Sequence, residues 1–374
     1  MNIMRIFLME PYFTGSHRTW AEGYKQHSRH DVEILSLEGR YWKWRMHGGA
    51  VSLAKSYMEH DSNPDLIIAT DMLDLTTFLS LTRERTAQIP VAVYFHENQI
   101  SYPWSAGDRD ILHKRDKHYG FINYVSALAA NAVLFNSSYH RESFLYELPR
   151  LLKHFPDFRE LFNIKAIETK SFVMHLGMDL STLDAYRSDP ESQSNGYKAP
   201  VILWNNRWEY DKNPDDFFKA LDIISEKGFD FQLVVLGENF RLRPDVFDRA
   251  QEKHKSRILQ FGYVEIRKEY VNWLCSSDIL PVTSNQDFFG MSVVEAVYCG
   301  IYPLLPRRLS YPEIFPPERF PLNYYDNFEN LVEKLTKLVS NAKSVQNVDY
   351  KEHLKKFSWE IKAPEYDDFF VSLL

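Results

Sequence analysis

Cysteine is scarce in this chain: Cys275 and Cys299 are the two cysteines among 374 residues. Two thiols are too few for a disulfide framework or for a zinc site built on thiolates. The sequence also lacks any apolar run long enough to span a membrane. The apolar start "IMRIFLM" is too short for a secretion signal and has no small-residue cleavage site, so it predicts a strand. These absences favour a cytoplasmic protein that does not enter a membrane.

Positive charge is not in excess. The chain has 44 Lys and Arg against 51 Asp and Glu, a formal net charge of −7, which excludes indiscriminate coating of nucleic acid. Aromatic residues, by contrast, make up 15% of the chain, and they commonly line sites for flat or ring-shaped ligands. Aromatics and cations are interleaved in "LEGRYWKWRMHGGA", residues 37–50. A local patch of this kind suits one particular RNA, although the whole chain is acidic.

Length and periodicity predict two α/β domains. A chain of 374 residues is too long for one compact core. In the first half, short apolar runs alternate with amphipathic stretches, as in a doubly wound parallel sheet. The predicted strands are Met4–Met9, Val32–Leu35, Leu66–Ala69, Val91–Phe95, Ala132–Phe135 and Ser171–Met174. The predicted helices include Thr19–His27, Leu73–Arg83 and Tyr119–Ala130.

The polar stretch "RSDPESQSNGYKAP", residues 187–200, has the composition of an interdomain linker. The alternation restarts after it, with strands predicted at Val201–Trp204, Gln232–Leu236, Ile258–Gly262, Ile279–Val282 and Tyr302–Leu305. The helices predicted between them are Pro214–Lys227, Pro244–Lys255, Arg267–Ser276 and Ser292–Tyr298. We therefore expect Rossmann-like domains at residues 1–186 and 197–357, with a closing helix at 358–374 that packs back on the first. Because ligands bind beyond the carboxyl ends of such strands, both halves are expected to contribute to one cleft.

Two cations follow the first strand of the second half. Arg207 and Lys212 lie five residues apart in "LWNNRWEYDKNP", just after the predicted strand Val201–Trp204. Cations that meet at a strand end suit a diphosphate, arginine through its planar fork and lysine as a point charge. Taken alone, the segment is better explained as a solvated turn with two surface cations.

Two carboxylates stand further on, in "SNQDFFGMSVVEAVYCG". Seven residues separate Asp287 from Glu295, and a helix is predicted to begin between them at Gly290 and Met291. The free N–H groups and positive dipole end of such a helix favour a phosphate. Glu295 lies in the apolar context "VVEAV", where a buried carboxylate needs a partner, and ribose hydroxyls would serve. The alternative is a carboxylate on a solvated helix face.

This combination resembles the family 4 retaining glycosyltransferases, which have the GT-B fold of two Rossmann-like domains. The resemblance implies that Arg207 and Lys212 neutralise the diphosphate of a nucleotide-sugar donor and that Glu295 holds its ribose. Asp287 stands where the family has Glu, which shortens the side chain by one methylene. The other donor contacts that the resemblance implies in this half are Tyr263, Val264, Phe288, Phe289, Gly290, Met291 and Ser292.

Two segments at predicted strand ends carry the polar residues of the first half. In "EPYFTGSHRTW", Gly15 and Ser16 permit a close approach of the backbone to the donor, and His17 is expected to point into the cleft. The segment "YFHENQISYPW" places His96, Glu97, Asn98 and Gln99 after the strand Val91–Phe95. These residues form no His-Glu-x-x-His zinc motif, because position 100 is Ile. For His96 the alternative is a satisfied histidine at a domain interface.

Both segments, with "RYWKWRMHGGA", "NSSYHRESF" and "HLGMDL", resemble a narrower branch of the family, the tRNA-queuosine mannosyltransferases, over essentially the whole chain. The resemblance implies transfer of mannose from GDP-mannose to queuosine in a tRNA anticodon, without a metal or another cofactor. It places His96 near the acceptor and the sugar. The residues expected to take part in catalysis are His96, Asp287, Arg207 and Lys212.

The aromatic and basic stretch has two interpretations. An anticodon loop presents unstacked bases and phosphates, which aromatic rings and cations bind. Alternatively, the stretch is a strand or helix edge whose tryptophans fill the core while the cations point to water. In a strand, Trp42 and Trp44 would share one face. On the first interpretation, the predicted acceptor contacts are His17, Trp42, Lys43, Trp44, Arg45, His96, Glu97, Asn98 and Gln99.

Two other functions stay open. One is a transferase that uses another nucleotide sugar and a small-molecule or lipid acceptor. The other is a non-catalytic RNA-binding protein that kept the fold, although the presence of Arg207, Lys212 and Glu295 speaks against it. A metal-dependent GT-A transferase needs Asp-x-Asp after a strand. Asp108-Arg109-Asp110 fits that string but follows the loop "SYPWSAG" instead.

Overall fold

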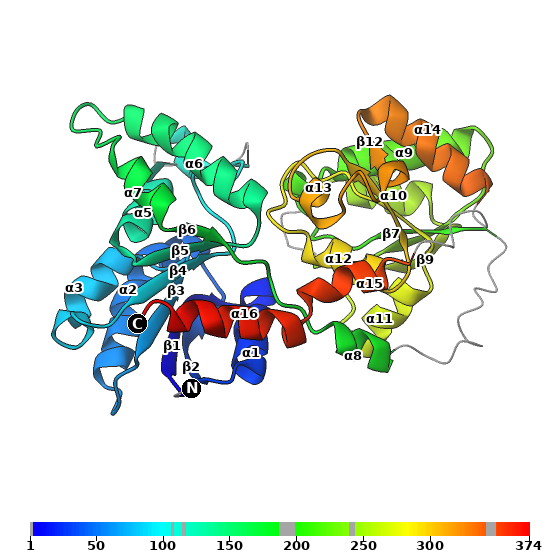
Figure 1. Cartoon of the computed structure of the whole chain (residues 1–374). Helices are drawn as coiled ribbons and strands as arrows, with labels where there is room; N and C mark the ends of the chain where they lie inside the picture. Colours follow the sequence, from blue (N-terminus) through cyan, green and yellow to red (C-terminus); the bar gives the residue numbers. More distant parts are fainter. Residues whose placement is uncertain (1–2, 106–107, 114–116, 187–198, 239–243, 342–348) are drawn as a thin grey trace. The chain divides into compact units, whose positions relative to one another are not determined.

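The computed structural model describes residues 3–105, 108–113, 117–186, 199–238, 244–341 and 349–374. The chain divides into two compact units, which we treat separately (Figure 1). Unit 1 comprises Met1–Met178 and Phe357–Leu374, and unit 2 comprises Asp179–Lys356. Residues 187–198 of the predicted linker lie outside the described residues. Within the described part, no helix combines the length and the apolar character needed to cross a membrane.

The expected boundary at residue 186 is corrected to Met178. Helix α8 (Leu180–Tyr186) belongs to unit 2 because it packs against α11 (Arg267–Cys275) and α12 (Met291–Tyr298). The Tyr298 hydroxyl also donates to the carboxylate of Asp184 at 2.9 Å. The polar composition that marks a linker begins only after this helix, so composition placed the boundary too late.

Unit 1 is built on a six-stranded parallel sheet in the order β2-β1-β3-β4-β5-β6. The strands are β1 (Arg5–Phe13), β2 (Asp31–Glu38), β3 (Leu66–Thr70), β4 (Val91–Phe95), β5 (Ala132–Phe135) and β6 (Ser171–Val173). Every residue of β3, β4 and β5 is buried. A central parallel strand is covered on both faces, which explains the unbroken apolar runs in the sequence. All six strands overlap the predicted ones.

The helices of unit 1 are α1 (Gly15–His27), α2 (Trp42–Met58), α3 (Leu75–Thr86), α4 (Arg109–Leu112), α5 (Lys117–Ala129), α6 (Ser138–Lys153), α7 (Asn163–Thr169) and α16 (Trp359–Val371). Helix α16 closes the unit by packing on α1 (Figure 1). A methyl group at either Gly23 or Gly177 would come within 2.2 Å of the Trp359 ring. Glycine at both positions therefore makes room for this tryptophan, and the closing helix packs on the first domain as its apolar spacing suggests.

Unit 2 contains a second parallel sheet, in the order β12-β11-β10-β7-β8-β9. Its strands are β7 (Val201–Trp204), β8 (Gln232–Val235), β9 (Ile258–Phe261), β10 (Ile279–Pro281), β11 (Tyr302–Pro306) and β12 (Tyr324–Tyr325). The remaining helical segments are η2 (Tyr210–Lys212), α9 (Pro214–Glu226), α10 (Val246–Lys253), α13 (Tyr311–Ile314), η3 (Pro321–Asn323), α14 (Phe328–Ser340), α15 (Lys351–Leu354) and η5 (Lys355–Phe357). Five strands were predicted; β12 was not, because two residues are too short to give a pattern.

In each parallel sheet, the order in which successive strands are added reverses beside the first strand. Strand β1 pairs with β2 on one side and β3 on the other, and β7 pairs with β8 and β10. In open α/β sheets, ligands bind at such a switch point, beyond the carboxyl ends of the strands. The segments that follow β1, β3 and β4 in unit 1, and β7 and β10 in unit 2, are therefore the places to look for functional side chains.

Candidate active site

Lys212 is a buried cation at the switch point of unit 2. Its ammonium donates to the carbonyl of Gln286 at 2.8 Å. It also lies 3.3 Å from the carboxylate of Asp211 and 3.7 Å from that of Asp287. The Asp211 side chain is fully buried and that of Lys212 is 10% exposed. Asp211 therefore compensates the buried lysine charge, and the ammonium is fixed where β7 and β10 end.

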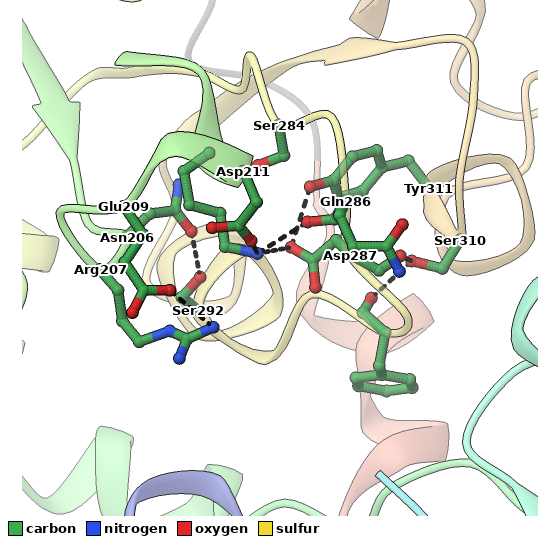
Figure 2. Close-up of polar contacts among 12 residues, drawn as sticks. Asn206, Arg207, Glu209, Asp211, Ser284, Gln286, Asp287, Ser292, Ser310 and Tyr311 are labelled. Atoms are coloured by element: carbon green, nitrogen blue, oxygen red, sulfur yellow. Dashed lines mark hydrogen bonds and ion pairs between the residues drawn. The ribbon is translucent and has the colours of Figure 1, made fainter. Parts of the chain in front are cut away.

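The loop after β10 brings Asp287 to the same place (Figure 2). The Tyr311 hydroxyl donates to its carboxylate at 3.0 Å. Burial and then the Asp287 charge raise the pKa of Tyr311 well above its ordinary value, so the phenol remains a donor. Gly290, at φ 89°, lies in the left-handed region that favours glycine and precedes the first residue of α12. The short side chain at 287 is thus held by Lys212 and Tyr311, and Tyr311 was not predicted.

Arg207 is situated differently from Lys212. Its guanidinium lies 3.3 Å from the carboxylate of Glu209, and its side chain is 45% exposed. Figure 2 shows Arg207 beside Glu209, on the opposite side of the cluster from Tyr311. Of the two predicted diphosphate cations, one is therefore buried and fixed by carboxylates, while the other extends into solvent.

Glu295 has its charge partner within unit 2. Arg267 donates to both carboxylate oxygens, at 3.4 Å through one nitrogen and over a shorter distance through the other, and the Tyr270 hydroxyl donates at 3.2 Å. Burial and the Glu295 charge raise the pKa of Tyr270 well above its ordinary value. The argument that burial of Glu295 requires ribose hydroxyls is therefore wrong, because Arg267 compensates the charge. Its contact with ribose stays a prediction, with Arg267 and Tyr270 as positioning residues.

We expect Glu295→Gln to raise the KM for the donor about tenfold, because the amide accepts hydrogen bonds from hydroxyls more weakly than a carboxylate does. The change also leaves Arg267 without its anion, so thermal unfolding must be followed in parallel with donor titrations. Arg267→Lys is the matched variant: it keeps the charge and loses the fork. A lower melting temperature with an unchanged KM in both variants would show that the pair is purely structural.

Two buried amides beside this cluster have side-chain atoms without a partner among the described residues: Oδ1 of Asn205 and Nε2 of Gln286. The described protein groups around these two atoms leave them unsatisfied, which is costly for a buried polar atom. The other predicted donor residues differ in exposure. Phe288 and Phe289 are buried, so their side chains are core and their backbone is what remains for a donor. Tyr263, after β9, is 61% exposed.

The remaining predicted donor residues lie at element boundaries. Val264 follows Tyr263 and is half-buried. Met291 and Ser292 are the first two residues of α12. The Ser292 hydroxyl donates to the side chain of Asn206 at 2.9 Å (Figure 2). In unit 1, Gly15 begins α1 at φ 49°, and a methyl group there would meet no atom within 4 Å. A ligand can therefore approach the backbone at Gly15.

In unit 1, the switch point holds a buried cluster of ionisable groups. His17, on the first turn of α1, lies with Nδ1 3.0 Å from Oε2 of Glu10 in β1. Asp71 follows β3 and accepts a hydrogen bond from the peptide nitrogen of His96, which follows β4, at 2.8 Å. The rings of His17 and His96 are 4.3 Å apart. Glu10 and Asp71 were not predicted, and His17 is engaged by Glu10 within the unit.

The two neighbouring histidines have opposite pKa shifts. Burial disfavours a charged imidazole, but the neighbouring carboxyl groups together, Glu10 foremost, outweigh burial and raise the pKa of His17 to about 9. Burial, followed by the charge on His17, lowers the pKa of His96 well below its ordinary value. Burial also raises the pKa of Asp71 to about 8. At neutral pH, a protonated His17 therefore neutralises Glu10, while His96 and Asp71 are uncharged.

This cluster is also the place where a metal ion could be held. Glu10, His17 and His96 each offer one ligand atom, and these atoms lie within 4.8 Å of one another. Nε2 of His96 has no hydrogen-bond partner among the described residues. A metal would have to displace the proton from His17, whose pKa of about 9 disfavours this exchange at neutral pH.

The residues after His96 form a turn whose Gln99 peptide nitrogen donates to the side chain of Asn123 in α5 at 2.7 Å. Asn98 is buried, and its side-chain oxygen accepts from the peptide nitrogens of Ile100 and Ser101 at 3.0 and 2.8 Å. Gln99 donates to Glu97 at 3.0 Å. Asn98 therefore shapes the turn, while the side chains of Glu97 and Gln99 remain half-buried.

The aromatic and basic stretch begins helix α2 and is not a strand. Trp42 packs on Tyr119, with ring centroids 5.2 Å apart. The Lys43 ammonium lies 2.6 Å from Asp108 and 2.5 Å from Asp110. Trp44, by contrast, is 62% exposed. The interpretation that Trp42 and Trp44 share a strand face is therefore wrong, and Lys43 is held by the two aspartates that match a metal-binding string.

The overall architecture has close structural counterparts. Sucrose-phosphate synthase from Thermosynechococcus elongatus matches with a TM-score of 0.73 at 13% identity, over 99% of both chains. A glycosyltransferase from Rickettsia africae matches with a TM-score of 0.68 at 16% identity, over 100% of this chain and 99% of the other. The sequence profile described as glycosyl transferases group 1 matches residues 187–354. The protein is thus a glycosyltransferase of GT-B fold, which confirms the predicted enzyme class and the predicted fold.

Comparisons that include the first half of the chain identify a narrower family of glycosyltransferases. The profile described as tRNA-queuosine alpha-mannosyltransferase N-terminal matches residues 5–178. The tRNA-queuosine alpha-mannosyltransferase of Drosophila melanogaster is 32% identical over 377 residues, which cover 98% of this chain and 96% of the fly protein. The chain therefore belongs to the tRNA-queuosine alpha-mannosyltransferase family, as the resemblance predicted.

Proposed function

We propose that the protein transfers mannose from GDP-mannose to queuosine in a tRNA, with retention of configuration at the sugar. The observation that supports the chemistry is Lys212, fixed between Asp211 and Asp287 beside the first turn of α12. Membership of the family supports the acceptor and the sugar. A tRNA acceptor also favours the cytoplasm as the place of action.

Unit 2 supplies the groups for the donor. Lys212 and the N–H groups at the start of α12 stabilise the negative charge that develops on the departing diphosphate. Arg207 adds a guanidinium fork from the exposed side. Asp287, oriented by Tyr311, accepts hydrogen bonds from hydroxyls of the transferred sugar. Glu295 accepts from the ribose.

Unit 1 supplies His96, which we assign a hydrogen bond to the transferred sugar. The transition state of such a transfer is oxocarbenium-like and carries positive charge at the sugar. A protonated histidine would oppose that charge. The lowered pKa of His96 keeps its imidazole neutral at working pH, so it can hydrogen-bond without repulsion.

The decisive experiment is incubation of queuosine-containing tRNA with the enzyme and GDP-mannose, followed by mass spectrometry of the nucleosides. We expect queuosine to gain the mass of one hexose, and UDP-glucose to give no product. Transfer from UDP-glucose, or to a lipid or small-molecule acceptor, would favour the alternative transferase. Binding of tRNA without donor turnover would favour the non-catalytic RNA-binding protein.

We expect activity to survive EDTA, because side chains and a helix terminus meet the leaving diphosphate instead of Mg²⁺. Initial rates with and without chelator should agree within about twofold. Complete loss of activity that Mg²⁺ or Mn²⁺ restores would contradict this and direct attention to Asp108 and Asp110, or to the cluster of Glu10, His17 and His96.

A further inference from the structure

The first turn of α2 divides its side chains between the interior and solvent. The Lys43 ammonium lies 5.2 Å from the Trp104 ring centroid and 5.6 Å from that of Trp42, in addition to its two aspartates. This half-buried cage anchors the turn. Tyr41 and Trp44 point the other way, with 78% and 62% of their surface exposed. Two large aromatic side chains are thus held in water by a firmly anchored turn.

Trp44 lies against the helix at a glycine. A methyl group at Gly48 would come within 2.6 Å of two carbons of the Trp44 ring and 3.1 Å of its nitrogen. The indole therefore covers Gly48, one turn further along α2, and any side chain there would displace it. One side of the ring is supported by the helix, and the exposed remainder is available for contact.

Stability does not explain this arrangement. Glycine inside a helix costs about 1 kcal/mol relative to alanine. Gly49 has a packing reason, because a methyl group there would lie 2.9 Å from Pro11. At Gly48 the nearest atoms are those of Trp44, a ring that remains mostly in solvent. Tyr41 also has a left-handed backbone, φ 54°, which is unfavourable for a residue with a side chain. Strain of this kind concentrates at functional sites.

Cations flank the two exposed rings. The Arg40 side chain is 72% exposed, and its contact with Glu38 at 3.4 Å is between two solvent-exposed groups, which makes it weak. Arg45 donates from Nε to the carbonyl of Glu38 at 3.0 Å. Exposed aromatic faces next to arginines match the chemistry of unpaired nucleobases joined by phosphates.

We propose that Tyr41 and Trp44 form a stacking platform for unpaired bases of the tRNA, with Trp44 supported by Gly48 and with Arg40 and Arg45 at the adjoining phosphates. This proposal rests on the proposed function for the identity of its RNA. The sequence predicts that Trp42 and Lys43 contact the tRNA. We assign these two residues to the anchor of the turn instead, and we assign Tyr41 and Arg40 to the RNA contacts.

The test is the dissociation constant of queuosine-containing tRNA, measured with the full chain and no sugar donor. Trp44→Ala is expected to raise it at least about fivefold, the lower end of what one stacked base contributes. Gly48→Ala is the sharper variant. It should weaken binding in the same way while the melting temperature is unchanged or higher, because alanine favours the helix.

Two control variants bracket the effect. Ser52→Ala changes an exposed position on the same helix, and Tyr146→Ala removes a 66% exposed aromatic from α6. Both should bind tRNA like wild type.

Arg40→Ala and Arg45→Ala should each reduce the slope of log affinity against log salt by about 1.

The outcomes separate this proposal from the proposed function. An enzyme that transfers mannose but binds tRNA equally well with Gly48→Ala and Trp44→Ala overturns the platform alone. Equal weakening by Tyr146→Ala overturns its specificity for this turn. Failure of the wild-type chain to bind any tRNA overturns the platform together with the tRNA acceptor.

Discussion

Replacement of Lys212 by alanine is expected to lower kcat/KM for the donor by at least about a hundredfold, the usual effect of removing one group that stabilises charge in the transition state. The expectation follows from placement: the Lys212 side chain is 10% exposed, and its ammonium is fixed by hydrogen bonding to the Gln286 carbonyl. A fixed cation needs no reorganisation when the diphosphate leaves. The measurement is steady-state turnover of GDP-mannose with saturating tRNA.

Loss of Lys212 also has a structural consequence, which the experiment must separate from catalysis. The fully buried Asp211 would lose its cation, and breaking a buried pair in this way costs about 3–5 kcal/mol. The matched variant is the double substitution Asp211→Asn with Lys212→Met, which removes both charges. We expect it to regain most of the melting temperature and none of the turnover. Recovery of turnover in the double variant would exclude Lys212 from catalysis.

Arg207→Ala gives the contrast within the same site. Its side chain is 45% exposed and pairs with Glu209 at the surface, so its removal should leave the melting temperature within about 1 °C of wild type. A fall in turnover without a fall in stability would then report on the diphosphate directly. The two variants therefore test the same role, binding of the diphosphate, once with a buried cation and once with an exposed one.

The strands were predictable because their pattern is local. In β4 and β5 every residue is apolar and buried, and the predicted bounds agree with the observed ones. Helix α2 was missed for physical reasons. The residue before it, Tyr41, is left-handed and caps no backbone group with its side chain, and two glycines interrupt the interior of the helix. Neither propensity nor capping therefore indicates a helix, and the structure is fixed by the Lys43 cage.

The candidate site was predictable in its positions but not in its partners. Lys212 and Asp287 follow β7 and β10, as alternation of strands and helices suggested. Their environment depends on side chains that are distant along the chain. Tyr311 holds Asp287 from another segment, and Arg267 neutralises Glu295 from the helix before β10. A pattern of residue types predicts where strands end, but it does not predict which side chains meet there.

Glu10 is the clearest case of a missed group, and it leads to a pH dependence. It lies in the apolar strand β1, where nothing in the sequence distinguishes it from a surface carboxylate. Burial lowers the pKa of His17 in the folded state, but Glu10, Asp71 and Glu97 raise it by more, so that it changes from 6.5 to about 9. A raised folded pKa contributes stability that is fully present below pH 6.5 and is lost as pH rises through 9. Asp71, raised to about 8, acts in the same direction up to that pH.

We therefore expect the free energy of unfolding to fall as pH rises from 6.5 to 9, by about 3 kcal/mol from His17, since one pKa unit corresponds to about 1.4 kcal/mol. Denaturant unfolding at several pH values measures this. His17→Gln should destabilise the protein by about 3–5 kcal/mol at pH 6.5, because Glu10 is left buried without a cation.

The double variant Glu10→Gln with His17→Gln removes both charges and is the matched control. It should restore part of the lost stability, remove the His17 contribution between pH 6.5 and 9 and leave a level profile above 8, while Asp71→Asn should only make the slope below 8 shallower. Because Asn can still accept the hydrogen bond from the His96 peptide nitrogen, Asp71→Asn keeps the turn intact. A wild-type profile that is level between pH 6.5 and 9, or that rises, would mean that His17 is neutral beside Glu10. The charge on His17 would then no longer add to burial in lowering the pKa of His96.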